Sequence, residues 1–123
     1  MSAQQRKTLE TQTMALQALQ SELATLVASR QKLDSQLQEN ELVDQEFKTM
    51  DDSARVYKMI GPVLVPQEKT EAEANVEKRL EYIRSETARV EKRIEQLSKE
   101  QEQKSVEIFK LQMEIQGINR AQS

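Results

Sequence analysis

The chain has 123 residues, of which 32% are charged and only 3% aromatic, with two glycines and two prolines. This composition is typical of long helices or a coiled coil and argues against an ordinary globular core. Histidine and cysteine are both absent. Their absence removes the commonest general base and metal ligand, together with disulfide and thiol chemistry. The net charge of −3 argues against a general binder of nucleic-acid phosphates.

Further classes of function are disfavoured by what the sequence lacks. The isolated glycines form no phosphate-binding loop, so we expect no enzymatic activity, no cofactor and no metal site. No apolar run approaches the ~20 residues of a membrane span, so we expect no membrane partner. The segment Met1–Lys7 has no apolar core behind its charges and is not typical of a secretory signal. A reducing compartment suits the cysteine-free chain.

A first helix is predicted over about residues 3–50. Ser2 and Gln5 fit a capping box at its start. Apolar residues then keep the alternating three- and four-residue spacing of a coiled-coil seam. These seam residues are Leu9, Leu16, Leu19, Leu23, Leu26, Leu33, Leu37 and Phe47. Arg30, Asn40 and Asp44 interrupt the seam and either fix its register or mark a looser coil.

The middle of the chain, about residues 54–66, predicts a β-hairpin, with an irregular loop as the alternative. Gly61 and Pro62 suit the two central positions of a type II′ turn, which needs a positive φ at the first only. Pro66 is expected to end the second strand. The residues expected to pair with other chains are Val56, Tyr57, Met59, Ile60, Gly61, Pro62, Val63, Leu64 and Val65.

A second helix is predicted over about residues 70–118, followed by a frayed tail at 119–123. Thr70 and Glu73 fit a capping box at its start, and Gly117 fits the C′ position of a Schellman motif. Gln101 and Lys104 are polar residues at consecutive core positions. The apolar seam residues are Val76, Leu80, Ile83, Val90, Ile94, Leu97, Ile108, Leu111, Ile115 and Ile118.

Together these elements predict a mainly α-helical single domain. The helices are of similar length and a compact turn-back joins them, so they should form an antiparallel two-helix coiled coil with both termini at its far end. A parallel dimer of extended chains remains an alternative. A lone two-stranded hairpin is marginally stable in water, so its strands should join strands of other chains.

Apolar residues at the far end of this coil form a candidate binding surface. A two-helix coil cannot enclose them on all sides, and exposed apolar patches mark interaction sites. The candidates are Leu9, Met14, Leu16, Leu111, Met113, Ile115 and Ile118. Met14 and Met113 would let the surface adapt to varied partners. Alternatively, all seven are ordinary seam residues.

Several segments resemble the β-class prefoldin subunits over nearly the whole chain. They are Arg30–Leu33, Gln36–Asn40, Val56–Lys58, Gly61–Val65 and Val76–Ile83. The hairpin and Lys78-Arg79-Leu80 are fairly specific, whereas the heptads are not.

The resemblance implies a hexamer of two α-class and four β-class prefoldin subunits, whose hairpins join in a β-barrel from which the coiled coils project. It also implies an ATP-independent holdase that captures unfolded proteins, notably actin and tubulin, at the coiled-coil tips. The client would then pass to a cytosolic group II chaperonin, which places the protein in the cytoplasm. The alternative is a structural coiled-coil tether or adaptor in a larger complex.

Overall fold

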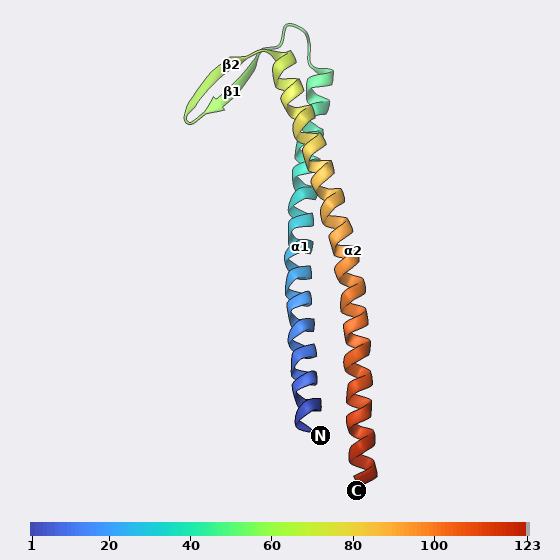
Figure 1. The fold of residues 1–123 in the computed structure, drawn as a ribbon. Helices are drawn as coiled ribbons and strands as arrows, with labels where there is room; N and C mark the ends of the chain where they lie inside the picture. The colour runs from blue at the N-terminus through green and yellow to red at the C-terminus, as the bar shows by residue number, and fades with distance from the viewer. Residues whose placement is uncertain (123) are drawn as a thin grey trace. The chain divides into compact units, whose positions relative to one another are not determined.

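The computed structural model describes residues 1–122, with side chains described for residues 1–117. Its elements are, in order, α1 (Ala3–Thr49), β1 (Val56–Ile60), β2 (Val63–Gln67) and α2 (Lys69–Gln122) (Figure 1). Two long antiparallel helices flanking a central β-hairpin confirm the predicted fold class. The chain divides into a hairpin unit, Arg30–Arg89, and a terminal unit, which combines Met1–Ser29 with the chain from Val90 onward.

The predicted capping box at the start of α1 is confirmed. The Gln5 amide donates to Ser2 Oγ, and the Ser2 amide donates to Gln5 Oε1, both at 3.0 Å. The two contacts satisfy backbone donors that have no partner inside the helix. At the other end, Lys69 Nζ donates to the carbonyl of Met50 at 3.3 Å. This contact ties the residue after α1 to the first residue of α2.

Both predicted ends of the second helix need correction. The helix already begins at Lys69, where the Ala72 amide donates to the Glu68 carbonyl at 3.0 Å, so Thr70 lies inside the first turn and not at a cap. The Schellman motif is also wrong, because α2 continues through Gly117 to Gln122. Among the described residues, only Gly61 has a positive φ. The predicted fraying of residues 119–123 stays a prediction, and residue 123 lies outside the described residues.

The hairpin has the register of a two-residue turn, because Ile60 pairs with Val63. Gly61 has a φ of 60°, a value that glycine adopts at no steric cost. Since Pro62 has the negative φ of all prolines, the combination fits the expected type II′ turn. The strand end predicted at Pro66 is wrong. Strand β2 continues to Gln67, with Pro66 opposite Tyr57.

The core of the hairpin unit gathers at the end of the helices that carries the hairpin. It contains one buried residue from α1, Phe47, and a stripe along α2 with helical spacing. The buried residues of the cluster are Phe47, Ala72, Val76 and Leu80, and Leu37, Met50 and Val56 pack against them. Val56 therefore anchors the base of β1 to the helices.

The core of the terminal unit is thinner. Val90, Leu97 and Ile115 of α2 are buried, with Leu97 at 0% exposure. The seam residues contributed by α1 are only half-buried: Leu9, Leu16, Leu19, Leu23 and Leu26. A pair of helices has one shared face, so neither helix can cover the flanks of the other's seam residues. Across this unit, Arg93 Nη2 donates to Glu22 Oε1 at 3.1 Å.

Candidate functional site

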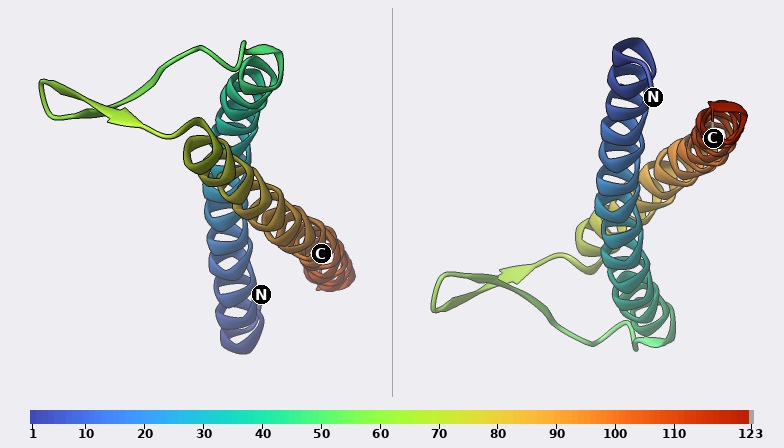
Figure 2. Two further views of the ribbon diagram at one scale, coloured as in Figure 1. Left: turned by 90° about the horizontal axis from the view of Figure 1, so that it is seen from above. Right: turned by 90° about the horizontal axis from the view of Figure 1, so that it is seen from below.

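The hairpin exposes an unusual amount of apolar surface. Both views in Figure 2 show its turn end projecting away from the helix ends of the hairpin unit. Met59 is 72% exposed and Leu64 is 60% exposed. Tyr57, Ile60, Val63 and Val65 are exposed as well. A patch of this kind on a soluble protein marks an interaction site.

The two faces of the hairpin differ in chemistry. Side chains alternate between faces along a strand, and cross-strand partners share a face. One face carries only apolar or aromatic side chains, namely Tyr57, Met59, Leu64 and Pro66. The other face carries Val56, Lys58, Ile60, Val63, Val65 and Gln67. Because Val56 packs on the core of the hairpin unit, the second face is anchored at its base and the first is free.

Two hollows flank the base of the hairpin. One, of about 470 Å³, lies between β1 and the helices and is lined by Phe47, Val56, Lys58 and Val76 among others. The other, of about 430 Å³, is lined by residues that include Tyr57, Pro66 and Lys69. Both are open and mix polar with apolar side chains. They leave room beside the strands, which suits a protein partner better than a small molecule.

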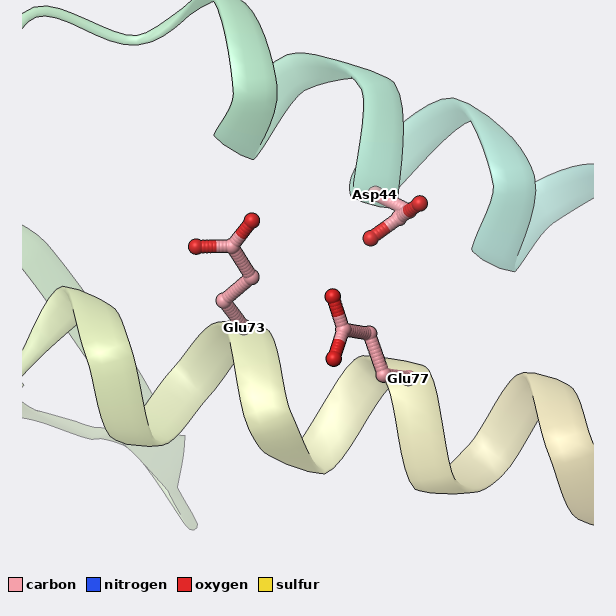
Figure 3. Close-up of side chains that lie close together, drawn as sticks. All are labelled: Asp44, Glu73 and Glu77. Carbon is pink, nitrogen blue, oxygen red and sulfur yellow. The ribbon is translucent and has the colours of Figure 1, made fainter.

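A cluster of three carboxylates lies next to the hairpin-unit core. Asp44 of α1 faces Glu73 and Glu77 of α2, and one carboxylate oxygen from each lies within 4.8 Å of the others (Figure 3). Lys48 supplies positive charge here, with Nζ at 3.0 Å from Asp44 Oδ2. The hydrogen bond to Asp44, its charge and the charges of Glu77 and Glu73 raise the pKa of Lys48 above 10.5. Lys48 and Asp44 therefore form an ion pair within α1, and Glu73 and Glu77 of α2 add negative charge around Lys48.

The terminal unit brings together most of the residues predicted for the binding tip, but with unequal exposure. Met14 and Met113 are exposed, whereas Leu9, Leu16 and Leu111 are half-buried in the seam. Ile115 was expected to be partly exposed; it is buried, because it packs in the seam between the helices. Ile118 lies outside the residues whose side chains are described.

Sequence reasoning selected Met113 but missed the second apolar stripe of this unit to which it belongs. Val106, Phe109 and Met113 follow helical spacing and are all exposed, Phe109 at 61%. At ~100° per residue, Met113 lies ~160° round the helix from both Leu111 and Ile115, so the stripe faces away from the seam. On α1, Met14 and Leu16 are also two residues apart, so Met14 likewise faces away from the seam. A search for apolar residues at helical spacing outside the heptad positions would have found this outer stripe.

A polar layer interrupts the seam of the terminal unit, as the sequence predicted. Gln101 and Lys104 are both half-buried there, and Lys104 Nζ lies 3.5 Å from Glu107 Oε2. A hollow of about 230 Å³ lies beside them, lined by Leu19, Glu100, Gln103, Lys104 and Glu107. The Lys104 side chain is 28% exposed, so its ammonium group can stay near water while its alkyl chain covers part of the layer. Apolar packing between the helices is therefore interrupted at this point.

Comparison with known proteins gives one consistent result. The profile of the prefoldin subunit family matches residues 10–115. Prefoldin subunit 6 of Saccharomyces cerevisiae is 46% identical over 95 residues, which cover 77% of this chain and 83% of the yeast protein. Prefoldin subunit 6 of Homo sapiens is 40% identical over 118 residues, covering 96% and 92%.

The solved structures agree on the fold. The crystal structure of the prefoldin beta subunit from Thermococcus strain KS-1 superposes with a TM-score of 0.75 at 23% identity, covering 82% of this chain and 89% of that one. Within the described residues, neither α1 nor α2 contains an apolar stretch that could span a membrane. The chain therefore belongs to the prefoldin subunit family, is of the subunit 6 type, and is a chaperone subunit rather than an enzyme.

Proposed function

We propose that this chain acts in a cytoplasmic, ATP-independent holdase built from two α-class and four β-class prefoldin subunits. The complex holds unfolded proteins, actin and tubulin among them, and passes them to a group II chaperonin. The hairpin mediates assembly with other subunits, and the terminal unit binds the client. The observation that carries the proposal is the presence of two exposed apolar surfaces, one in each unit of the chain.

Assembly through the hairpin follows from its energetics. A two-stranded hairpin alone is marginal in water, and this one keeps Met59 and Leu64 largely exposed. Burying one such side chain contributes roughly 1.5–3 kcal/mol. Strands contributed by other prefoldin subunits would cover these side chains and pair the free backbone groups at the same time.

Client contact falls to the exposed apolar side chains of the terminal unit. Met14, Phe109 and Met113 are available without any rearrangement, whereas Leu9, Leu16 and Leu111 contribute their exposed portions. Ile115 becomes available only if the helices separate locally. Methionine side chains are unbranched and polarizable, so they fit irregular apolar surfaces of varied clients.

The strength of this contact suits a holdase. A few apolar side chains supply only a few kcal/mol, part of which is lost in ordering the side chains and the client. Binding to one subunit should therefore be weak and fast. Several subunits that hold one client raise the affinity through effective concentration. Multivalent binding of this kind is broad in specificity and reversible, as transfer to a chaperonin requires.

Removal of the end of the coil tests the proposal. In the assembled complex, residues 1–16 and 111–123 of this subunit are deleted together, which leaves the hairpin unit intact. Assembly should survive, and protection of a denatured client from aggregation should fall. If the truncated complex protects the client as well as the intact one, the tether hypothesis replaces the holdase hypothesis.

A further inference from the structure

The two outer edges of the hairpin are not equivalent. With a two-residue turn, the pair that closes the turn exchanges both main-chain hydrogen bonds, and hydrogen-bonded and non-hydrogen-bonded pairs then alternate. The hydrogen-bonded pairs are Ile60–Val63, Lys58–Val65 and Val56–Gln67. Met59–Leu64 and Tyr57–Pro66 are the non-hydrogen-bonded pairs. In these two pairs the backbone groups point outward, toward any strand that is added.

This alternation explains why proline is tolerated inside β2. Pro66 occupies a position whose N–H would point outward, so the hairpin loses no hydrogen bond of its own. The donor that is missing at Pro66 is one that would have faced outward from the edge of β2. There Leu64 offers both an N–H and a C=O, but Pro66 offers only a C=O. On the outer edge of β1, Tyr57 and Met59 each offer both groups.

We propose that a strand from the hairpin of another prefoldin subunit pairs with the outer edge of β1 along its whole length, as far as Tyr57. A strand that joins the outer edge of β2 pairs near the turn and ends before Pro66. This inference rests on the proposed function, because it assumes that the subunits assemble through their hairpins.

The occupant of the β1 edge is a β-strand, because a row of unpaired main-chain donors and acceptors is complementary only to another such row. Its side chains over Tyr57 and Met59 must be apolar, since these two share the free apolar face of the hairpin. Its side chains over Lys58 face the other side, where an acidic or neutral polar residue fits.

Amide hydrogen exchange in the assembled complex tests the assignment. The Tyr57 amide points outward and should exchange rapidly in the free chain at a concentration too low for self-association. On assembly, the exchange rate of this amide should fall by about a hundredfold or more, because the amide gains a hydrogen-bond partner in the added strand. The variant Pro66→Val adds the missing outward N–H to β2. If the proline is what ends the pairing on this edge, the new amide should become protected on assembly and association should tighten.

A matched pair of substitutions gives a second readout. Tyr57→Pro removes the outward donor and leaves the hairpin's own ladder intact, whereas Tyr57→Val keeps the donor and shortens the side chain. Association with the partner subunits should be about tenfold weaker for Tyr57→Pro than for Tyr57→Val, because a buried carbonyl of the added strand loses its donor.

Two results would overturn the edge assignment. One is equal association of the Tyr57→Pro and Tyr57→Val variants. The other is a Pro66→Val complex in which the new amide stays unprotected and association is unchanged, because the proline would then not be what ends the pairing on β2. The double variant Met59→Pro, Leu64→Pro removes an outward donor from each edge near the turn. Its normal assembly would refute the hairpin as the assembly element and with it the proposed function. Its failure to assemble, combined with an unprotected Tyr57 amide in the unmodified complex, would refute the edge assignment alone.

Discussion

Met59 lies directly opposite Leu64 across the hairpin, and these two side chains are 72% and 60% exposed. Cross-strand partners at a non-hydrogen-bonded pair lie close together, so the two form one continuous apolar surface on the free face. Neither contributes to the core of the hairpin unit, which is made by Phe47, Ala72, Val76 and Leu80. The folding of the helices and the chemistry of the hairpin can therefore be altered separately.

Charging this pair should abolish assembly and leave the helices intact. The double variant Met59→Lys, Leu64→Lys should fail to join the partner subunits, since burying two adjacent ammonium groups is costly. Native mass spectrometry measures assembly, and circular dichroism measures helix content. The control is Leu42→Lys, Tyr82→Lys, which charges two exposed apolar positions on the helices of the same unit. Equal assembly of both double variants would contradict the assignment of the hairpin.

The unmodified chain, kept alone, should not remain a folded monomer. Its exposed strand edges and apolar hairpin face should drive self-association or aggregation at micromolar concentration. Analytical ultracentrifugation measures the state of the chain. A monodisperse monomer that melts cooperatively would contradict this prediction.

The two glycines should respond oppositely to alanine. Gly61→Ala forces an alanine to a φ of 60°, which costs roughly 1–2 kcal/mol, so association with partner subunits should weaken about tenfold. Gly117→Ala should stabilise α2 by roughly 0.5–1 kcal/mol in chemical denaturation, because its φ is ordinary and the site lies within the helix. A Cβ at either position meets nothing within 4 Å, so the backbone alone decides both effects. Similar effects at the two sites would disprove the turn assignment.

Replacing the polar layer of the terminal unit should tighten its coil. Lys104→Leu puts an apolar side chain beside the hollow next to Leu19 and should stabilise the coil by roughly 1 kcal/mol. In the unmodified chain, amides of residues 105–117 should exchange faster than those of residues 80–97, where Leu80, Ile83, Val90 and Leu97 are buried. The variant should reduce that difference. Equal protection of both segments in the unmodified chain would refute the prediction that the polar layer lowers the local stability of the coil.

Lys48 should stabilise the contact between the helices of the hairpin unit in a pH-dependent way. Asp44, Glu77 and Glu73 raise its pKa above 10.5, so its contribution is complete below that pH. The contribution is lost as the pH rises through the folded-state pKa, where the ammonium group loses its proton. The melting temperature of the complex assembled with Lys48→Met should therefore lie below that of the unmodified complex from pH 7 to about pH 10, and the gap should close as the pH rises beyond 10.5. Lys99→Met, at the exposed pair with Glu95, is the control. A gap that persists unchanged at high pH would exclude the charge as its cause.

The architecture could be predicted because each element has a strong local signal. The seam spacing marked both helices, the Ser2–Gln5 capping box marked the start of α1, and Gly61-Pro62 marked the turn. The errors arose where a local rule was applied without the pairing register. Pro66 does not end β2, because its missing N–H lies at an outward position, which only the register reveals.

The terminal surface was harder to predict. Heptad analysis selects residues that face the other helix, so it selected Ile115, which the seam buries. It passed over Val106 and Phe109, which lie on the outside of α2. Side-chain exposure separates these two classes, and in a two-helix coil it depends on which flank the partner helix leaves open. The sequence pattern alone does not contain that information.

Site-specific photo-crosslinking tests the central claim, client holding by the terminal unit, most directly. A photoreactive phenylalanine analogue replaces Phe109 in one assembled complex and Leu42 in another, since the two positions are 61% and 68% exposed. Both complexes are irradiated with a chemically denatured, labelled client. If the terminal unit holds the client, crosslinks should be strong from position 109 and at background from position 42. Equal yields at the two positions, or crosslinks from position 42 alone, would contradict that claim.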